Sequence, residues 1–297
     1  MIFIKNFVRK NDISRVKLLF EELKYIFNEM IDENEWMDEN SKRWLKEELK
    51  TLKAFIGEPE EYRNIEKMYE RVEKSKPAEQ QGYLELVRNL LKMNSEETFL
   101  RVARREVMTY QVDSSVMYGS HRISIPSILF SYPFLDENLP YWNTIATLGY
   151  FIGHEIGHAF DAQRFLQSED KQEFEKRVKC ITDGSFMSWS IFGVKVNPFF
   201  ESDGVKTRIA DKLGFDLAYR LFKKIRKPQK LPAFEEETID QQFFQRIASA
   251  LCAKKLSQKD KHSFRVNGMM SNSMEFAKSF NCDKNTPMNP DKKCPLL

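Results

Sequence analysis

The chain contains a long and mostly apolar stretch at residues 141–160, whose sequence is YWNTIATLGYFIGHEIGHAF. Its length and nearly continuous hydrophobic character predict a helix that is buried inside the protein. Three glycines interrupt it, Gly149, Gly153 and Gly157, and each of them costs a helix about 1 kcal/mol relative to alanine. Three such residues in one helix therefore indicate close packing against another element or a functional constraint on the backbone.

The same stretch ends in an H-E-x-x-H pattern formed by His154, Glu155 and His158. Residues four apart lie one turn apart on one helix face, so both imidazoles can reach one metal ion while Glu155 projects beside them. Zinc held by two histidines and one further ligand keeps a coordination position for water, and the glutamate can take that water's proton as it attacks a peptide carbonyl. Asp161 is placed to accept a hydrogen bond from the free ring nitrogen of His158.

The alternative explanation for this pattern is a helix whose two histidines are merely buried and hydrogen-bonded. The chain has only four histidines, so a chance match to the pattern is rare and we favour a metal site. The four cysteines form no Cys-x-x-Cys pair, and they therefore indicate neither a zinc ribbon nor a thioredoxin-type redox site.

Helices and short strands are expected on both sides of the motif. Apolar residues at three- and four-residue spacing predict a helix at 12–30, and further helices are expected at 41–56, 65–73, 80–93, 171–183, 207–225, 240–256 and 273–280. Short runs of β-branched and aromatic residues predict strands at 108–112 and 122–125. The fold class that follows is mainly α with a small β-sheet (α+β), in which the charged helices of the first hundred residues form a packing layer.

Composition excludes several classes of protein. The 47 lysines and arginines against 44 aspartates and glutamates give a net charge of +3, so we expect no nucleic-acid partner, which would require a dense basic face. No apolar run approaches the roughly 18 residues that span a membrane. The N-terminal apolar run is cut short by Lys5, and we expect no export signal in this chain.

Short motifs occur along almost the whole chain in a recognisable order. They are Trp36-Met37-Asp38, Ile125-Pro126, the helix ending in His158-Ala-Phe-Asp161, Lys179-Cys180, Ile209-Ala-Asp211, Ala218-Tyr219-Arg220, Phe264-Arg-Val-Asn-Gly268 and the tail from Cys282 to Cys294. This series resembles the neprilysin family of zinc metallopeptidases. The resemblance implies a thermolysin-like zincin catalytic domain at 106–297, preceded by helices at 1–105 that remain from a helical cover domain.

The resemblance also implies an activity, which is the hydrolysis of oligopeptides by a zinc metalloendopeptidase. Zinc would be the cofactor, His154 and His158 its ligands, and Glu155 the general base and then acid. Asp161 and Asp211 would orient the two histidines. Peptides would be the substrates.

The third zinc ligand of the family is a glutamate four residues before the supporting aspartate. The matching positions are Thr207 and Asp211, so the aspartate is present and the carboxylate ligand is not. A threonine hydroxyl is neutral and shorter than a glutamate, which makes it a poor zinc donor. Glu201, Asp203 and His121 are the other candidates for a third ligand.

Further positions resemble the family's substrate-binding residues. Asp113 and Ser114 stand where family members carry an Asn-Ala pair that binds the substrate backbone, and an aspartate there can accept but not donate. Arg265 resembles the arginine that binds a substrate carbonyl, and His262 the histidine that stabilises the oxyanion. The alternatives are an ordinary ion pair for Arg265 and a surface loop position, near residues 259–261, for His262.

Two other functions remain as hypotheses. Thr207 and Asp113 favour a catalytically inactive homologue that binds peptides or partner proteins, whereas the intact motif together with Asp161 and Asp211 favours catalysis. A purely structural helical protein is the third hypothesis, and zinc binding of any strength would exclude it.

The resemblance assigns the four cysteines to two classes. Cys180 and Cys294 resemble a pair that forms a disulfide within the catalytic domain, whereas Cys252 and Cys282 resemble residues whose partners lie in a preceding part of a longer protein. Family members are usually extracellular or membrane-anchored, so the resemblance implies an extracellular or cell-surface location.

Overall fold

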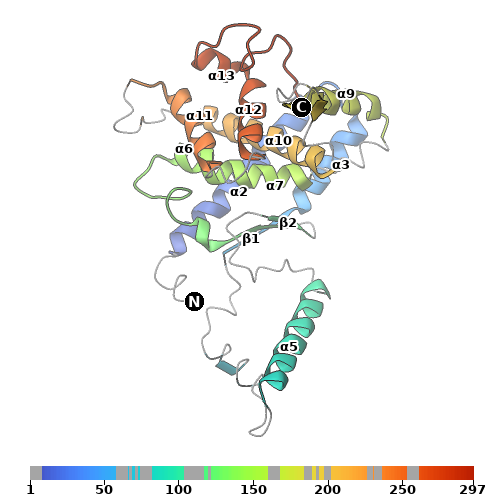
Figure 1. Ribbon diagram of the computed structural model, residues 1–297, viewed down its shortest axis with the longest axis vertical. Coiled ribbons are helices and arrows are strands. Elements are labelled where there is room, and N and C mark those ends of the chain that lie inside the picture. The colour runs from blue at the N-terminus through green and yellow to red at the C-terminus, as the bar shows by residue number, and fades with distance from the viewer. Residues whose placement is uncertain are drawn as a thin grey trace.

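A computed structural model describes residues 9–57, 82–103, 117–119, 122–159, 168–183, 189–191, 194–196, 202–225, 236–252 and 261–297, together with Glu66, Tyr69, Glu70, Glu73 and Lys230. The larger helices are α2 (Lys10–Glu33), α3 (Glu39–Thr51), α5 (Tyr83–Ala103), α7 (Tyr150–Ala159), α9 (Lys171–Asp183), α10 (Ser202–Lys224), α11 (Ile239–Ala250) and α12 (Lys261–Ser271). Shorter helical elements are η2 (Ser127–Leu129), α6 (Tyr141–Thr144), η3 (Ile145–Gly149) and α13 (Met274–Ser279). With two small sheets, this architecture (Figure 1) confirms the expected α+β class.

The helix that carries the motif, α7, packs along α10 (Figure 1). Their backbones approach closely because small residues face each other. A Cβ atom built on Gly157 would lie 2.6 Å from Cα of Ala210, and one built on Gly153 would lie 3.0 Å from Cα of Gly214. At Gly149 the nearest atoms would be at an ordinary 3.5 Å. Two of the three glycines in the motif helix therefore serve close packing, as the sequence indicates.

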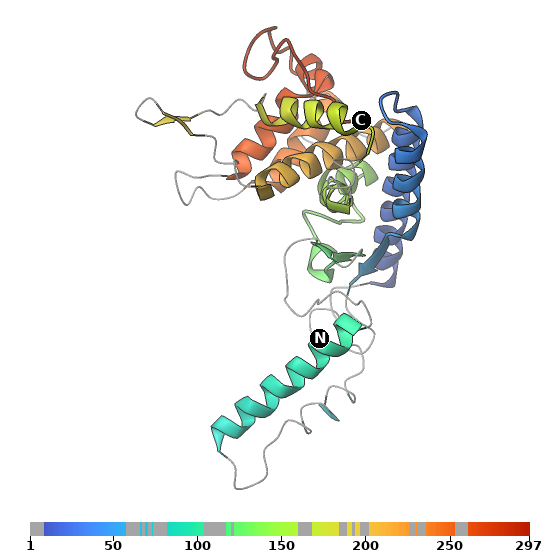
Figure 2. The same cartoon turned by 90° about the vertical axis from the view of Figure 1, so that its right-hand side faces the viewer.

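α10 is the central helix of the described body. It contacts α2, η3, α7, α9 and α12, and its buried apolar side chains belong to the same hydrophobic cluster as those of α2, α3 and α11. Figure 2 shows α2 and α3 along one side of this body, whereas α5 stands apart from the other helices. No described helix is both long and apolar enough to cross a membrane.

A three-stranded sheet lies beside the motif helix. Its order is β1 (Lys53–Ile56), β3 (Arg122–Ile125) and β2 (Met117–Gly119), with β1 parallel and β2 antiparallel to β3. The register places Lys53 opposite Arg122 and Ile56 opposite Ile125. Because α7 contacts both β2 and β3, the sheet lies directly beside the helix that carries the motif. A second, two-stranded sheet pairs β4 (Trp189–Ile191) with β5 (Val194–Val196).

The expectation of one helix over 41–56 is wrong in its last residues. The helix ends at Thr51, the backbone is extended at Leu52, and residues 53–56 form β1. Gly57, with φ of +78°, ends the strand, and its N–H donates to the carbonyl of Ile125 at 2.8 Å. Pairing with a distant strand overrides the local helical spacing here.

The stretch at 141–159 is one helical run, as expected, but it contains a π-helical turn. The turn is η3, all five of whose residues are buried. Within it, the hydroxyl of Thr147 donates to the carbonyls of Asn143, at 2.8 Å, and Phe134, at 2.9 Å. The side chain thus supplies hydrogen bonds where the regular backbone pattern is interrupted.

The remaining expected elements are mostly present. The helices expected at 12–30, 80–93, 171–183, 207–225 and 273–280 correspond to α2, α5, α9, α10 and α13, and the strand at 122–125 is β3. The helix expected at 240–256 ends earlier, at Ala250, because tight turns from Leu251 and Cys252 to the carbonyls of Ala248 and Ser249 close it. The strand at 108–112 and most of the helix at 65–73 lie outside the described residues. The sequence patterns do not predict β2, η2, β4, β5 or α12.

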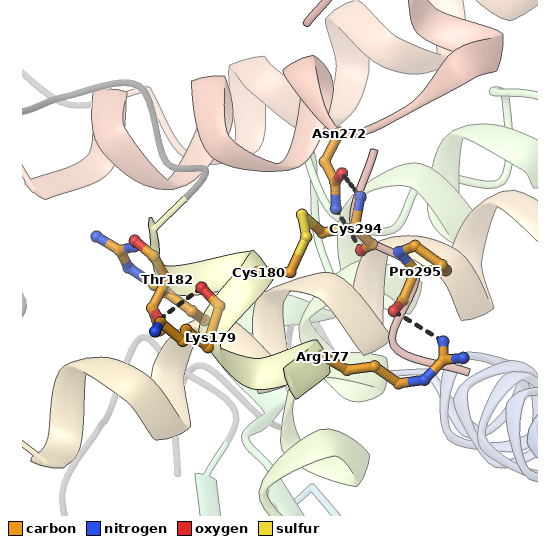
Figure 3. The surroundings of a disulfide bond; sticks show 8 residues. Arg177, Lys179, Cys180, Thr182, Asn272, Cys294 and Pro295 are labelled. Carbon is orange, nitrogen blue, oxygen red and sulfur yellow. Dashed lines mark hydrogen bonds between the residues drawn. A yellow bond between two sulfur atoms is a disulfide. The ribbon is translucent and has the colours of Figure 1, made fainter. Parts of the chain in front are cut away.

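A disulfide ties α9 to the C-terminal tail (Figure 3). Cys180 and Cys294 are bonded, with their Cα atoms 5.5 Å apart, which confirms the predicted pair. Asn272 brackets Cys294: its amide donates to the Cys294 carbonyl at 2.7 Å and its oxygen accepts from the Cys294 N–H. Cys252 and Cys282 are free thiols in the structure.

Replacement of Gly157 by alanine should destabilise the fold, because the added methyl group would overlap the backbone of Ala210. We expect the free energy of unfolding to fall by about 1–3 kcal/mol, the usual effect of overpacking. Gly268→Ala in α12 is the matched control, since its methyl group would meet nothing within 4 Å. The control should leave stability equal or raise it by up to about 1 kcal/mol. Denaturant unfolding measures both, and equal effects would contradict the close crossing.

Loss of the disulfide should also lower stability. The bond joins residues 114 positions apart, so Cys180→Ser releases a long loop in the unfolded chain, and the free energy of unfolding should fall by about 2–5 kcal/mol. Cys252→Ser, at an exposed free thiol, should change it by no more than about 0.5 kcal/mol. Denaturant unfolding without reductant makes the comparison, and equal stability of the two variants would show that the bond does not constrain the fold.

Candidate metal centre

Two imidazoles of α7 face each other at the candidate centre. His154 and His158 lie one turn apart, and their Nε2 atoms are 3.1 Å from each other. Glu155 lies beside them, with its Oε1 atom 4.0 Å from Nε2 of His154. Among the described side chains these three form a cluster that could hold one metal ion, because their ligand atoms all lie within 4.8 Å of one another.

The partner of His154 comes from α10. Oδ1 of Asp211 is 2.8 Å from Nδ1 of His154, and the Asp211 side chain is only 4% exposed. The helix crossing allows this approach, since a Cβ atom on Gly214 would lie 2.6 Å from the backbone nitrogen of His154. When Nδ1 donates to the carboxylate, Nε2 keeps the lone pair that a metal requires, and Nε2 is the atom that faces His158.

Two further side chains bind the same carboxylate. Arg265 of α12 donates to Asp211 through Nη2, at 2.6 Å from Oδ1, and through Nε, at 2.9 Å from Oδ2. Tyr150, one turn before His154 on α7, donates its hydroxyl to Oδ1 at 2.7 Å. Side chains of α7 and α12 thus meet at the buried carboxylate that α10 carries.

These contacts set the charge of the network. Burial by itself would raise the pKa of Asp211, but hydrogen bonds from His154 and Arg265 outweigh burial and hold that pKa below its ordinary value. Burial opposes the charge of Arg265, but its bonds to Asp211 and the charge of that carboxylate hold its pKa above the ordinary value. Burial, with the charge of Asp211, raises the pKa of Tyr150, so its hydroxyl stays protonated and can donate.

His158 is held in the neutral form. Burial lowers its pKa to about 4, and the neighbouring His154 adds to this effect. Arg265 and Lys206 act in the same direction, whereas the charge of Asp211 opposes it. The ring is therefore neutral at pH 7, which is the form of imidazole that binds metal ions.

The donor set fits a zinc ion bound by two histidines. Zinc binds imidazole nitrogen at about 2.0–2.1 Å, so two Nε2 atoms that are 3.1 Å apart can share one ion. Thr207, the position that would match the family's third ligand, lies on α10 one turn before Asp211 and is half-buried. Its side chain offers a hydroxyl in place of a carboxylate.

The structure brings together five of the predicted site residues, His154, Glu155, His158, Asp211 and Arg265. His262 and Asp203 are each the second residue of a helix, α12 and α10 respectively. A loop position for His262 is therefore wrong, because the helix already begins at Lys261. The other predicted residues lie outside the described part of the chain: Asp113, Ser114, His121, Asp161 and Glu201.

Tyr150 is a member of the network that sequence analysis does not identify. Its spacing of four residues from His154 is a signal for the same helix face. Within a nearly continuous apolar stretch, however, a tyrosine is an ordinary core residue, and the carboxylate that it meets belongs to a helix 61 residues later in the chain.

The sequence of the chain is similar to that of a known peptidase family and of proteins named neprilysin. The model of peptidase family M13 matches residues 116–296. Neprilysin-1 of Caenorhabditis elegans is 25% identical to the chain, over 99% of the chain and 43% of its own length. Human neprilysin is 27% identical, over 94% of the chain and 41% of its own length. The chain thus spans less than half the length of these curated relatives.

Solved structures share the fold. The inhibitor complex of the zinc metalloprotease Zmp1 from Mycobacterium tuberculosis matches 99% of this chain and 48% of its own, with a TM-score of 0.75 and 18% identity. A Haemonchus galactose-containing glycoprotein complex matches 100% of this chain and 51% of its own, with a TM-score of 0.81 and 21% identity. These matches confirm the zincin-like fold that the sequence motifs imply.

Proposed function

Because the chain belongs to peptidase family M13, the neprilysin family, we propose that it carries the catalytic centre of a zinc metalloendopeptidase that hydrolyses oligopeptides. The observation that carries the proposal is the paired Nε2 atoms of His154 and His158, 3.1 Å apart, with Nδ1 of His154 on a buried carboxylate. This arrangement leaves the lone pair on Nε2 of His154 available for an ion, holds that ring in place, and puts Nε2 of His158 within reach of the same ion.

His154 and His158 would hold the zinc ion, which supplies a Lewis acid for the peptide carbonyl and lowers the pKa of water. Glu155 would take the proton of the attacking water and deliver it to the leaving amine as the peptide bond breaks. Asp211 keeps Nδ1 of His154 protonated, and Arg265 fixes Asp211. His262 and Arg265 are the candidates to stabilise the negative charge that develops on the carbonyl oxygen.

The proposed site has an incomplete ligand set. With threonine at 207, two protein ligands hold the ion, so we expect weaker zinc binding and lower activity than a carboxylate there would give. Asp203, one turn before Thr207 on α10, and the undescribed Glu201 and His121 remain the candidates for a third ligand.

The wider assignment rests on the family. We propose oligopeptides as substrates, an extracellular or cell-surface location, and a division into a helical lead-in at 1–105 and a catalytic domain at 106–297. Asp113 and Ser114 would contact the substrate backbone, and Asp161 would orient His158. Cys252 and Cys282 would pair with cysteines in a preceding part of a longer protein.

A second function is supported by one specific observation. Thr207 removes a carboxylate from the position that binds zinc in the family, so a catalytically inactive homologue that binds peptides is the alternative. The two functions differ in hydrolysis and share peptide binding, which allows a direct test.

Replacement of Glu155 by alanine should abolish hydrolysis and leave zinc bound. We expect the purified chain to hold stoichiometric zinc and to cleave oligopeptides, with the rate reduced about 10²–10⁴-fold in the variant, since a general base has been removed. Glu39→Ala, at a side chain that is 85% exposed on α3, should keep full activity. Metal analysis and a fluorogenic peptide assay provide the measurements.

Three outcomes of that assay are informative. Zinc binding with peptide binding but no hydrolysis in the unaltered chain would favour the inactive homologue. Hydrolysis that survives in Glu155→Ala would contradict the role of this glutamate, and absence of zinc would contradict the metal site.

Replacement of Thr207 by glutamate should increase both zinc affinity and activity, because it restores an anionic oxygen donor one turn before Asp211. We expect an increase in zinc affinity on the order of ten- to a hundredfold, measured by competition with a chelator. Thr207→Gln has the same length without the charge and should give a much smaller increase. No gain in affinity or rate with glutamate would show that position 207 does not lie beside the metal.

A further inference from the structure

Tyr150 is a buried polar residue that the proposed mechanism does not use. It lies on α7 one turn before His154 and is 0% exposed. Its ring packs against Phe151, with ring centroids 5.3 Å apart, and lies 6.3 Å from the ring of His154. Hydrophobic packing accounts for the ring, whereas the hydroxyl needs a separate explanation, because a phenylalanine would fill the same space.

The hydroxyl contacts the oxygen that holds the metal-binding histidine. Oδ1 of Asp211 accepts from the Tyr150 hydroxyl at 2.7 Å, from Nδ1 of His154 at 2.8 Å and from Nη2 of Arg265 at 2.6 Å. Oδ2 accepts from Nε of Arg265 at 2.9 Å. Arg265 approaches from α12, whereas Tyr150 and His154 approach from the same helix and meet the same oxygen atom.

Because Tyr150 and His154 donate to the same oxygen, the position of the Asp211 carboxylate relative to α7 is restricted. Arg265 binds both carboxylate oxygens, but it ties them to α12, so the position of Oδ1 relative to α7 would depend on how α12 packs. A hydroxyl fixed on α7 links Oδ1 to the helix that carries His154, so the oxygen and the imidazole keep their relative positions.

We propose that Tyr150 is a positioning residue of the metal centre, whose hydroxyl holds Oδ1 of Asp211 in line with Nδ1 of His154 so that Nε2 faces His158. The inference deepens the proposed zinc site and rests on it for its effect on metal affinity. Its effect on the imidazole itself requires no metal.

A matched control exists elsewhere in the chain. The hydroxyl of Tyr219 also donates to a carboxylate, Oδ1 of Asp240, at the same distance of 2.7 Å. Tyr219 lies on α10 and Asp240 on α11, and neither belongs to the described network around His154. Tyr219→Phe therefore removes a tyrosine–carboxylate hydrogen bond of the same length without touching the metal centre.

The first test is zinc affinity, measured by competition with a chelator in the complete chain. Tyr150→Phe should weaken zinc binding about tenfold, within the range seen when outer partners of metal-bound histidines are removed, and Tyr219→Phe should change it less than about twofold. In an Asp211→Ala background, which removes the acceptor oxygen, the further effect of Tyr150→Phe should vanish, because the hydroxyl acts through that carboxylate. Unchanged affinity in Tyr150→Phe, or an equal loss in the Asp211→Ala background, would overturn the inference.

The second test uses the metal-free chain and distinguishes this inference from the proposed function. The ¹⁵N NMR signals of His154 should report a proton on Nδ1 in the unaltered chain and in Tyr219→Phe, with a smaller Nδ1–H population in Tyr150→Phe. An unaltered tautomer in Tyr150→Phe would overturn the inference even if zinc binds. Absence of zinc binding together with the expected tautomer change would instead refute the zinc site and leave the positioning role supported.

Discussion

The crossing of α7 and α10 is the constraint on which the candidate site depends. At Gly157 and Gly153 no side chain separates the two backbones, and the backbone of Gly214 lies against that of His154. Only at this separation can a side chain as short as Asp211 reach Nδ1 of a histidine on the neighbouring helix. The large hydrophobic side chains of α10, such as Leu213 and Leu217, are fully buried and supply the burial that offsets glycine's poor helix propensity.

The buried charge of Asp211 links this crossing to the C-terminal part of the chain. An ionised carboxylate that is 4% exposed requires compensation, and Arg265 of α12 provides it. The end of α12 is held in turn by the tail: Lys293 donates to the carbonyl of Ser271 at 2.7 Å, and Asn272 brackets Cys294. The disulfide to Cys180 then fastens the tail to α9. The helix that carries Arg265 is therefore held at its end by the disulfide-bonded tail and along its length by the ion pair with Asp211.

Sequence patterns predict the parts of the fold that depend on local periodicity. The helix at 171–183 is found with the expected bounds as α9, and the apolar stretch around the motif is helical as expected. The strand β1 could not be predicted in the same way, because its residues continue a helical spacing and become a strand only by pairing with β3. Likewise, α12 begins at Lys261, within a charged stretch whose sequence predicts a loop, and its helical state is supported by contacts with α10 and α13.

The candidate site, too, is predicted in part by local sequence patterns and depends in part on contacts between distant segments. The spacing of His154 and His158 is local information, and the family motifs point to Asp211 and Arg265, but no local pattern indicates that Tyr150 shares an oxygen with His154. We propose that the two histidines of α7 bind one zinc ion, and X-ray absorption at the zinc edge of the metal-loaded chain measures the ligands of that ion. The expected result is scattering from at least two imidazoles, with nitrogen or oxygen donors completing the shell. Sulfur ligands, or zinc without histidine scattering, would contradict it.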